Sequence, residues 1–142
     1  MILLDVNVLV EAGHRDAVRH RPSAAWLSET LAGNRPVGLA DVVLTGCARI
    51  LTHPRVFADP ATPAAVSDYL STVRAAPAAT PLTATAATWR RFDDLLQGDP
   101  GLRGNLVPDA WLAALALSHG ASLATRDRGF GRFPGLSLIR PM

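Results

Sequence analysis

The feature that most constrains the fold is the opening run of four large apolar residues, MILL at positions 1–4, which ends on an acid, Asp5. Because polar and apolar residues do not alternate in it, the run is typical of a strand covered on both faces, as in parallel α/β sheets. Ligands bind beyond the carboxyl ends of the strands in such sheets, and Asp5 stands at one of these ends. Residues 6–12 predict a helix directly afterwards, so this stretch alone is equally compatible with Asp5 being only a helix cap.

Length and composition define the class of protein. The chain has 142 residues, of which 49% are hydrophobic, and this predicts a single domain over residues 1–142 with a substantial core. Its one cysteine, Cys47, cannot form an internal disulfide, which favours a reducing compartment, and we expect a cytoplasmic protein. The apolar start is interrupted by Asp5 after four residues, so it predicts neither a signal peptide nor a membrane span.

The charges are unusual because all fourteen basic residues are arginine, although the net charge is only +2. A charge of this size does not by itself indicate a nucleic-acid-binding protein. The fixed fork of donors in arginine suits phosphate groups, but a coding bias also produces a chain rich in alanine and arginine. The composition leaves both explanations open.

The rest of the chain alternates predicted strands and helices, which indicates an α/β fold built on a mainly parallel sheet. Pro81 would confine its strand to a sheet edge, a serine at position 23 and Asp41 are expected to cap helices, and residues 14–21 are expected to form a polar loop. Further strands are predicted at 36–40, 79–82, 121–125 and 136–139, and further helices at 22–33, 42–51, 62–77, around 89–96 and within 104–120.

Two more acids occupy positions like that of Asp5. Asp109 lies in the first turn of an almost wholly apolar helix that ends at Gly120, and Asp127 follows directly on the strand predicted at 121–125. A helix so apolar must be buried, so Asp109 either benefits from the positive helix end or faces a site. We therefore expect the three aspartates to converge on one rim of a parallel sheet. The alternative is that they are unrelated helix caps and surface acids.

Three carboxylates placed together would define the chemistry of such a rim. They repel one another and stay ionised at neutral pH only when a cation lies among them. Oxygen ligands favour a hard ion, Mg²⁺ or Mn²⁺, whereas the cysteine and histidine ligands expected for zinc are missing from the pattern. Such an ion activates water and stabilises charge on a phosphodiester, and Arg126 and Arg128 beside Asp127 would supply phosphate contacts. The pattern favours hydrolysis of a nucleic acid.

The chain resembles a PIN domain of the VapC toxin type along essentially its whole length. The resemblance is carried by the stretches MILLDVNVL, VGLADVVLTGCARILTHPRVF, GNLVPDAWLAALALSHGASL and ATRDRGFGRFPGL. It implies a three-layer α/β/α fold with a mainly parallel central sheet, in which the first strand is central and the third lies at an edge. It also implies an endoribonuclease that depends on Mg²⁺ or Mn²⁺, forms a homodimer, and acts as the toxin of a pair whose cognate VapB-type antitoxin inhibits it by binding around the acidic site.

Carried over position by position, the resemblance makes Asp5, Asp109 and Asp127 the catalytic, metal-binding acids. Asn7 matches the polar position that follows the first acid. The remaining candidates are Asn7, Asp41 and Thr125 in supporting roles and Arg49, Arg126 and Arg128 as contacts for RNA.

The sequence also departs from the family pattern. Gly46 stands where the family has a glutamate three residues before Arg49, Gly129 stands where a further acid is often found, and Pro108 replaces a common threonine. These departures bear on metal affinity more than on the fold. The alternative function is therefore a binding module that keeps the PIN fold and the antitoxin contact but has lost efficient turnover. A response-regulator receiver and a haloacid-dehalogenase-type phosphatase are disfavoured because both rely on a lysine, and this sequence contains none.

Overall fold

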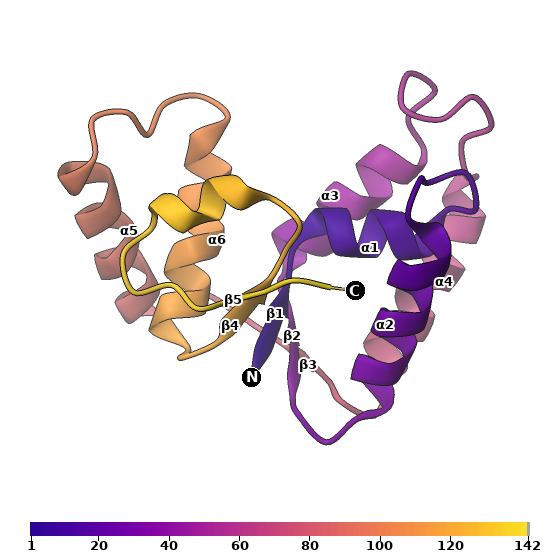
Figure 1. The fold of residues 1–142 in the computed structure, drawn as a ribbon, viewed down its shortest axis with the longest axis horizontal. Helices are drawn as coiled ribbons and strands as arrows, with labels where there is room; N and C mark the ends of the chain where they lie inside the picture. The colour runs from indigo at the N-terminus through magenta and orange to yellow at the C-terminus, as the bar shows by residue number, and fades with distance from the viewer. Residues whose placement is uncertain (142) are drawn as a thin grey trace.

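The structure is a computed structural model and describes residues 1–141. Five strands form one parallel sheet in the order β3-β2-β1-β4-β5, with helices on both faces (Figure 1). The three-layer α/β/α fold expected from the sequence is thereby confirmed. The strands are β1 (Ile2–Leu4), β2 (Val37–Leu39), β3 (Ala79–Pro81), β4 (Ser122–Ala124) and β5 (Leu138–Ile139). The helices are α1 (Val6–Gly13), α2 (His20–Ala32), α3 (Asp41–Leu51), α4 (Pro63–Ala75), α5 (Ala86–Gly98) and α6 (Leu106–Ser118), followed by a 3₁₀ turn, η1 (Arg128–Arg132).

The central strand β1 explains the unbroken apolar run at the start of the chain. It pairs with β2 on one side and with β4 on the other, so that Ile2 is level with both Val37 and Ser122. Helices α1 to α4 lie on one side of the sheet and α5 and α6 on the other (Figure 1). Both faces of β1 are therefore covered, and Leu3 and Leu4 are fully buried.

Helix α6 is also apolar because it is buried. It packs between the sheet and α5, with which it makes an extensive contact. Its buried residues are small or unbranched at Cβ: Ala110, Leu112, Ala113, Ala114, Leu115 and Ala116. Within residues 1–141, no helix combines the length and the apolar character that crossing a membrane requires.

The edge position of the third strand is also confirmed. Strand β3 pairs with β2 alone in the strand order, and Pro81 is its last residue, level with Leu39. Proline lacks the amide hydrogen that an interior strand must donate, so this end of an edge strand accommodates it. Cys47 is buried in the core, where burial raises the pKa of its thiol to about 12.

Two expected helix caps were wrong. Helix α2 begins at His20, earlier than position 22, so the side chain of Ser23 lies inside the helix and is fully buried instead of capping it. His20 and Arg21 consequently belong to α2 and not to the preceding loop. In α3 the extended residue Ala40 occupies the N-cap position, and Asp41 is the first helical residue, with an exposed side chain.

Gly120 terminates α6 and sets the direction of the chain into β4. Its backbone has φ of +62°, which L side chains rarely adopt. The amide of Gly120 donates to Leu117 O at 3.3 Å and that of Ala121 donates to Ala116 O at 2.9 Å, the two hydrogen bonds of a Schellman motif.

Replacing this glycine should therefore cost stability. We expect Gly120→Ala to lower the free energy of unfolding by about 1–2 kcal/mol because a Cβ is strained in the left-handed region. Gly98→Ala, at the end of α5, is the control: among the described residues nothing lies within 4 Å of a Cβ built there. Urea denaturation followed by circular dichroism measures both, and equal stability of the two variants would contradict this account of the helix end.

Candidate active site

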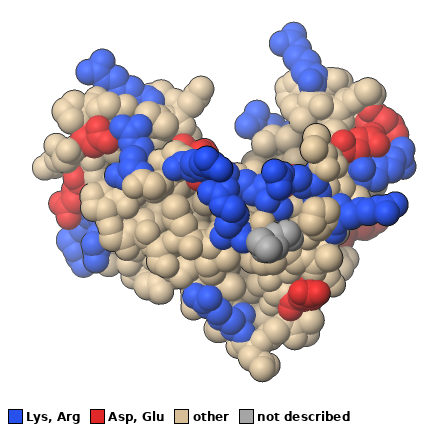
Figure 2. All heavy atoms as spheres, in the orientation of Figure 1, with Lys and Arg blue, Asp and Glu red and all other residues tan. Residues whose placement is uncertain are grey.

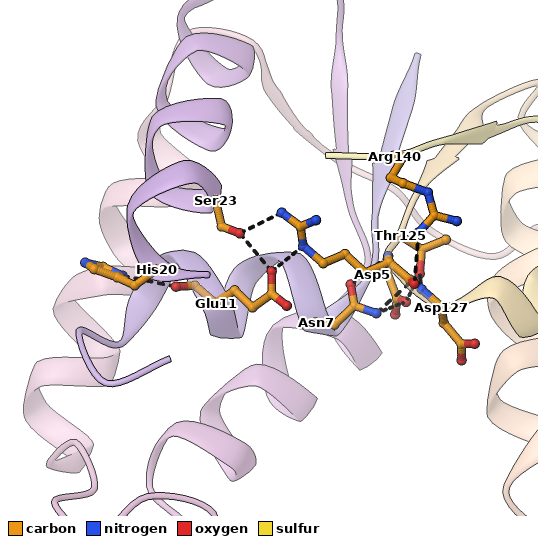
Figure 3. A network of polar contacts seen from close by, with 9 residues as sticks. Asp5, Asn7, Glu11, His20, Ser23, Thr125, Asp127 and Arg140 are labelled. Atoms are coloured by element: carbon orange, nitrogen blue, oxygen red, sulfur yellow. Dashed lines mark hydrogen bonds and ion pairs between the residues drawn. The ribbon is translucent and has the colours of Figure 1, made fainter. Parts of the chain in front are cut away.

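Asp5 lies at the carboxyl end of the central strand and is both a helix cap and the centre of a polar cluster. Its backbone amide donates to Ala124 O of the neighbouring strand at 3.0 Å. Its Oδ1 accepts from the amide of Val6 at 2.7 Å, which caps α1. Its Oδ2 accepts from the Thr125 hydroxyl at 2.6 Å and from Asn7 Nδ2 at 3.0 Å (Figure 3). The two interpretations of Asp5 left open by the sequence are thus compatible.

The environment of Asp5 perturbs its ionisation. The side chain is buried, with 8% of its residue surface exposed. Burial is the largest influence and raises the pKa of Asp5 above its ordinary value. The hydrogen bonds from Thr125 and Val6 oppose the rise, whereas the negative charge of Asp127 adds to it. The carboxylate is therefore costly to ionise until something positive approaches it.

Thr125 and Asn7 connect the ends of β1 and β4. Besides donating to Asp5, the buried Thr125 hydroxyl accepts from the amide of Asp127 at 3.0 Å and from Asn7 Nδ2 at 3.3 Å. The Oδ1 of Asn7 accepts from the amide of Arg126 at 3.4 Å. Two of the three supporting residues proposed from the sequence, Asn7 and Thr125, thus contact Asp5 directly and hold the segment that carries Asp127.

Asp127 is exposed and forms the cap of η1. Its Oδ1 accepts from the amide of Gly129 at 2.7 Å. A Cβ at position 129 would lie 3.0 Å from that same oxygen, tighter than ordinary contact. A side chain at position 129 would therefore require the Asp127 carboxylate to shift.

Asp109 lies in the first turn of α6 and is half-buried. Asn105 occupies the N-cap position, so Asp109 is not the helix cap that one interpretation of the sequence required. Burial raises the pKa of Asp109 most, and the charges of Asp127 and then of Asp5 raise it further. The charge of Asp127 therefore acts on both Asp5 and Asp109, and that of Asp5 acts on Asp109.

The donor set at this rim is entirely oxygen. Burial raises the pKa of Asp5 and of Asp109 most, and the charge of Asp127 adds to both; a hard cation is the partner that relieves such repulsion. In the part of the chain that the structure describes, however, no three His, Cys, Asp or Glu side chains lie close enough to form a metal-binding group as they stand. The chemistry of the residues fits a cation, and their spacing is looser than that of a closed metal site.

A polar network next to this cluster was not predicted from the sequence. Arg126 Nε donates to Glu11 Oε2, and Arg126 Nη2 donates to Ser23 Oγ at 3.1 Å. The Arg126 guanidinium is thus already hydrogen-bonded within the protein. Its contact with RNA stays a prediction. A signal was available: Glu11 is the lone acid of an apolar helix and follows Asn7 by four residues, which puts both on one helix face.

The other candidate residues are exposed. Arg49 is exposed in the last turn of α3, and Arg128 is exposed at the start of η1, directly after Asp127. The charges that act on Asp5 and Asp109 do not include Asp41, in the described part of the chain. Arg140, which the sequence did not single out, is exposed and donates to Arg126 O at 3.4 Å (Figure 3).

Position 46 of α3 lies against the first residue of α1. A Cβ built on Gly46 would lie 3.3 Å from Val6 Cγ2, and Val6 directly follows Asp5. A side chain at this position would therefore press on Val6, the residue that follows Asp5. Glycine leaves that volume without a side chain.

Comparison with known proteins agrees with the fold. The profile of the PIN domain family matches residues 2–136. A VapC ribonuclease of Mycobacterium bovis and ribonuclease VapC43 of Mycobacterium tuberculosis are each 40% identical to this chain over 143 residues, covering 100% of it and 96% of the relative.

Solved structures share the fold at lower identity. The VapBC2 structure from Rickettsia felis, bound to promoter DNA, superposes with a TM-score of 0.70 at 20% identity and covers 98% of both chains. Mycobacterium tuberculosis VapC20, described as a toxin that cleaves the sarcin–ricin loop, superposes with a TM-score of 0.67 at 18% identity and covers 99% of this chain and 100% of its own. With its full-length match, its parallel sheet and its three strand-end and helix-end aspartates, this chain belongs to the PIN domain family, among the VapC-type proteins.

Proposed function

We propose that this protein is a metal-dependent endoribonuclease and the toxin of a VapBC-type toxin–antitoxin pair. The observation that carries the proposal is the group of Asp5, Asp109 and Asp127, whose charges act on one another at the carboxyl ends of the strands. Full-length relatives at 40% identity that are named ribonucleases support the same activity.

The three aspartates would hold Mg²⁺ or Mn²⁺. When bound, such an ion activates water and stabilises the charge that develops on a phosphodiester. Thr125 and Asn7 would keep the Asp5 carboxylate oriented through the hydrogen bonds that they already donate to it.

Arginines would bind the RNA backbone. Arg128 and Arg140 are both exposed: Arg128 directly follows Asp127, and Arg140 donates to Arg126 O. Figure 2 shows arginine side chains gathered near the middle of the face that it presents, close to a hollow at the upper edge. Phosphate contacts of this kind supply affinity without reading sequence, so they favour RNA as a class and no particular target.

The cognate VapB-type antitoxin would inhibit the enzyme by covering the acidic rim. An arginine from the antitoxin suits the three carboxylates, because charge-assisted hydrogen bonds to carboxylates are strong. Its apolar residues would lie in a groove of about 320 Å³ between α2 and α4, whose lining includes Leu27, Leu31 and Val73. A homodimer, as the family resemblance implies, is part of the same proposal.

Asp5→Asn should abolish cleavage while leaving the fold intact. Asparagine caps a helix about as well as aspartate, so α1 is retained, but the charge that would hold the cation is lost. We expect a loss greater than the roughly 10- to 100-fold cost of removing an outer-shell partner of a metal ligand. Cleavage of total RNA in Mn²⁺ measures it, with Asp68→Asn, exposed on α4, as the control.

Excess chelator should stop the wild-type enzyme in the same assay. Full activity in chelator, or in Asp5→Asn, would contradict the proposed site. A wild-type protein that binds its antitoxin but cuts no RNA would favour the alternative, a PIN-fold binding module without turnover.

Asp109→Asn should stabilise the metal-free protein. The folded-state pKa of Asp109 is raised above its ordinary value of 3.8, so ionisation of this group costs stability at neutral pH. The cost disappears when the group is protonated, and the advantage of the variant should therefore shrink as the pH falls through the raised pKa. Urea denaturation in chelator between neutral and acidic pH tests this, and a variant less stable than wild type at every pH would refute it.

Gly46→Glu should lower the Mn²⁺ concentration needed for half-maximal cleavage. The added side chain starts beside Val6 and brings a fourth carboxylate to the cluster. Gly46→Gln is the matched control, because it has the same size without the charge. Asp41→Asn should leave the requirement nearly unchanged, and a large loss in that variant with no gain in Gly46→Glu would show that Asp41 had replaced the missing acid.

A further inference from the structure

Arg126 is placed between two residues of the site but turns its side chain away from them. Its neighbours in sequence are Thr125, which donates to Asp5, and Asp127. Its own guanidinium is bound by Glu11 of α1 and Ser23 of α2. In Figure 3 these two partners lie on the far side of Asn7 from Asp127.

The Arg126 guanidinium belongs to a group of three side chains that all contact one another. Ser23 Oγ donates to Glu11 Oε2 at 2.8 Å and accepts from Arg126, so each of the three side chains contacts the other two. The ion pair is largely shielded, with 13% of the Arg126 side chain and 22% of the Glu11 side chain exposed. The backbone of Glu11 is held as well, because its carbonyl oxygen lies 3.0 Å from His20 Nδ1.

The backbone of Arg126 connects these three side chains to the residues around Asp5. Its amide donates to Asn7 Oδ1, and its carbonyl oxygen accepts from Arg140. The next amide, that of Asp127, donates to Thr125 Oγ1 at 3.0 Å. A displacement of Arg126 would therefore move Asp127 and disturb two of the groups that orient Asp5.

We propose that Glu11 is a positioning residue: with Ser23 it holds the Arg126 guanidinium, and it thereby fixes residues 125–127 so that Asp127 keeps its place beside Asp5. The effect on cleavage rests on the proposed function, whereas the effect on the order of this segment does not. Side chains behind metal ligands act in this way, by orienting groups that they do not replace.

The competing account is that Arg126 is a contact for RNA, as the sequence alone indicated. The two accounts differ in what they require of Glu11. An acid beside an RNA-binding arginine repels phosphate, so removing it should strengthen RNA binding and lower KM. If Glu11 positions the segment, removing it should lower kcat and leave KM nearly unchanged.

Steady-state cleavage of a pool of synthetic RNA hairpins in Mn²⁺ separates these accounts. The variants are Glu11→Gln, Arg126→Met and the double variant, with Asp59→Asn as the control because it removes an exposed ion pair with Arg15 outside the site. We expect each of the first three to lose about 10- to 100-fold in kcat, and the double variant to lose no more than either single one. Asp59→Asn should match wild type.

Three outcomes would overturn the proposal. These are an unchanged kcat in Glu11→Gln, a raised KM in Arg126→Met with a lowered KM in Glu11→Gln, or recovery of kcat in the double variant. The last would mean that a released Arg126 blocks the carboxylates and that the segment needs no support from Glu11.

Amide hydrogen exchange, followed by NMR in the absence of metal and RNA, is the second readout. The amides of Asp127 and Gly129 should exchange about tenfold faster in Glu11→Gln than in wild type, and no faster in Asp59→Asn. Glu11→Gln is nearly isosteric and retains an acceptor for Ser23, so it is expected to fold. If the wild-type protein cuts no RNA, the proposed function fails, but unchanged exchange in Glu11→Gln is what refutes the positioning role.

Discussion

A carboxylate at the buried end of the central strand is the constraint on which the rest of this structure depends. Asp5 has little contact with water, so its charge must be satisfied by the protein. One oxygen is bound by the first turn of α1, and the other by Thr125 and Asn7. These contacts require the start of a helix and the end of a second strand at the same point, which in turn fixes how α1 and β4 meet β1.

The parts of the fold that could be predicted from the sequence are the buried elements. An apolar run that stops at an acid is a local pattern, and both β1 and β4 followed from such patterns. The apolar character of α6 likewise follows directly from its burial. Burial is encoded in the residues that experience it. The central place of β1, by contrast, was expected only from the family resemblance, with which Pro81 at an edge is compatible.

The features that could not be predicted depend on contacts between distant parts of the chain. Glu11 and Arg126 are 115 residues apart, and neither carries a local sign that it pairs with the other. Ser23 resembles a helix cap in sequence, and only the packing of α2 against α1 shows that its hydroxyl is needed inside the helix. Asp41 failed as a cap because the backbone of Ala40 already supplies the extended residue that precedes α3.

The strand order has a consequence for the order in which parts of the structure form during synthesis. The first strand of the sequence is central, and one of its two neighbours, β4, is formed by residues 122–124. A nascent chain therefore keeps one edge of β1 unpaired until most of this sequence has emerged from the ribosome. Asp109, Thr125 and Asp127 also arrive late, so an incomplete chain lacks two of the three carboxylates. Contacts of such long sequence separation form slowly, so the group of three carboxylates is among the last features of the fold to assemble.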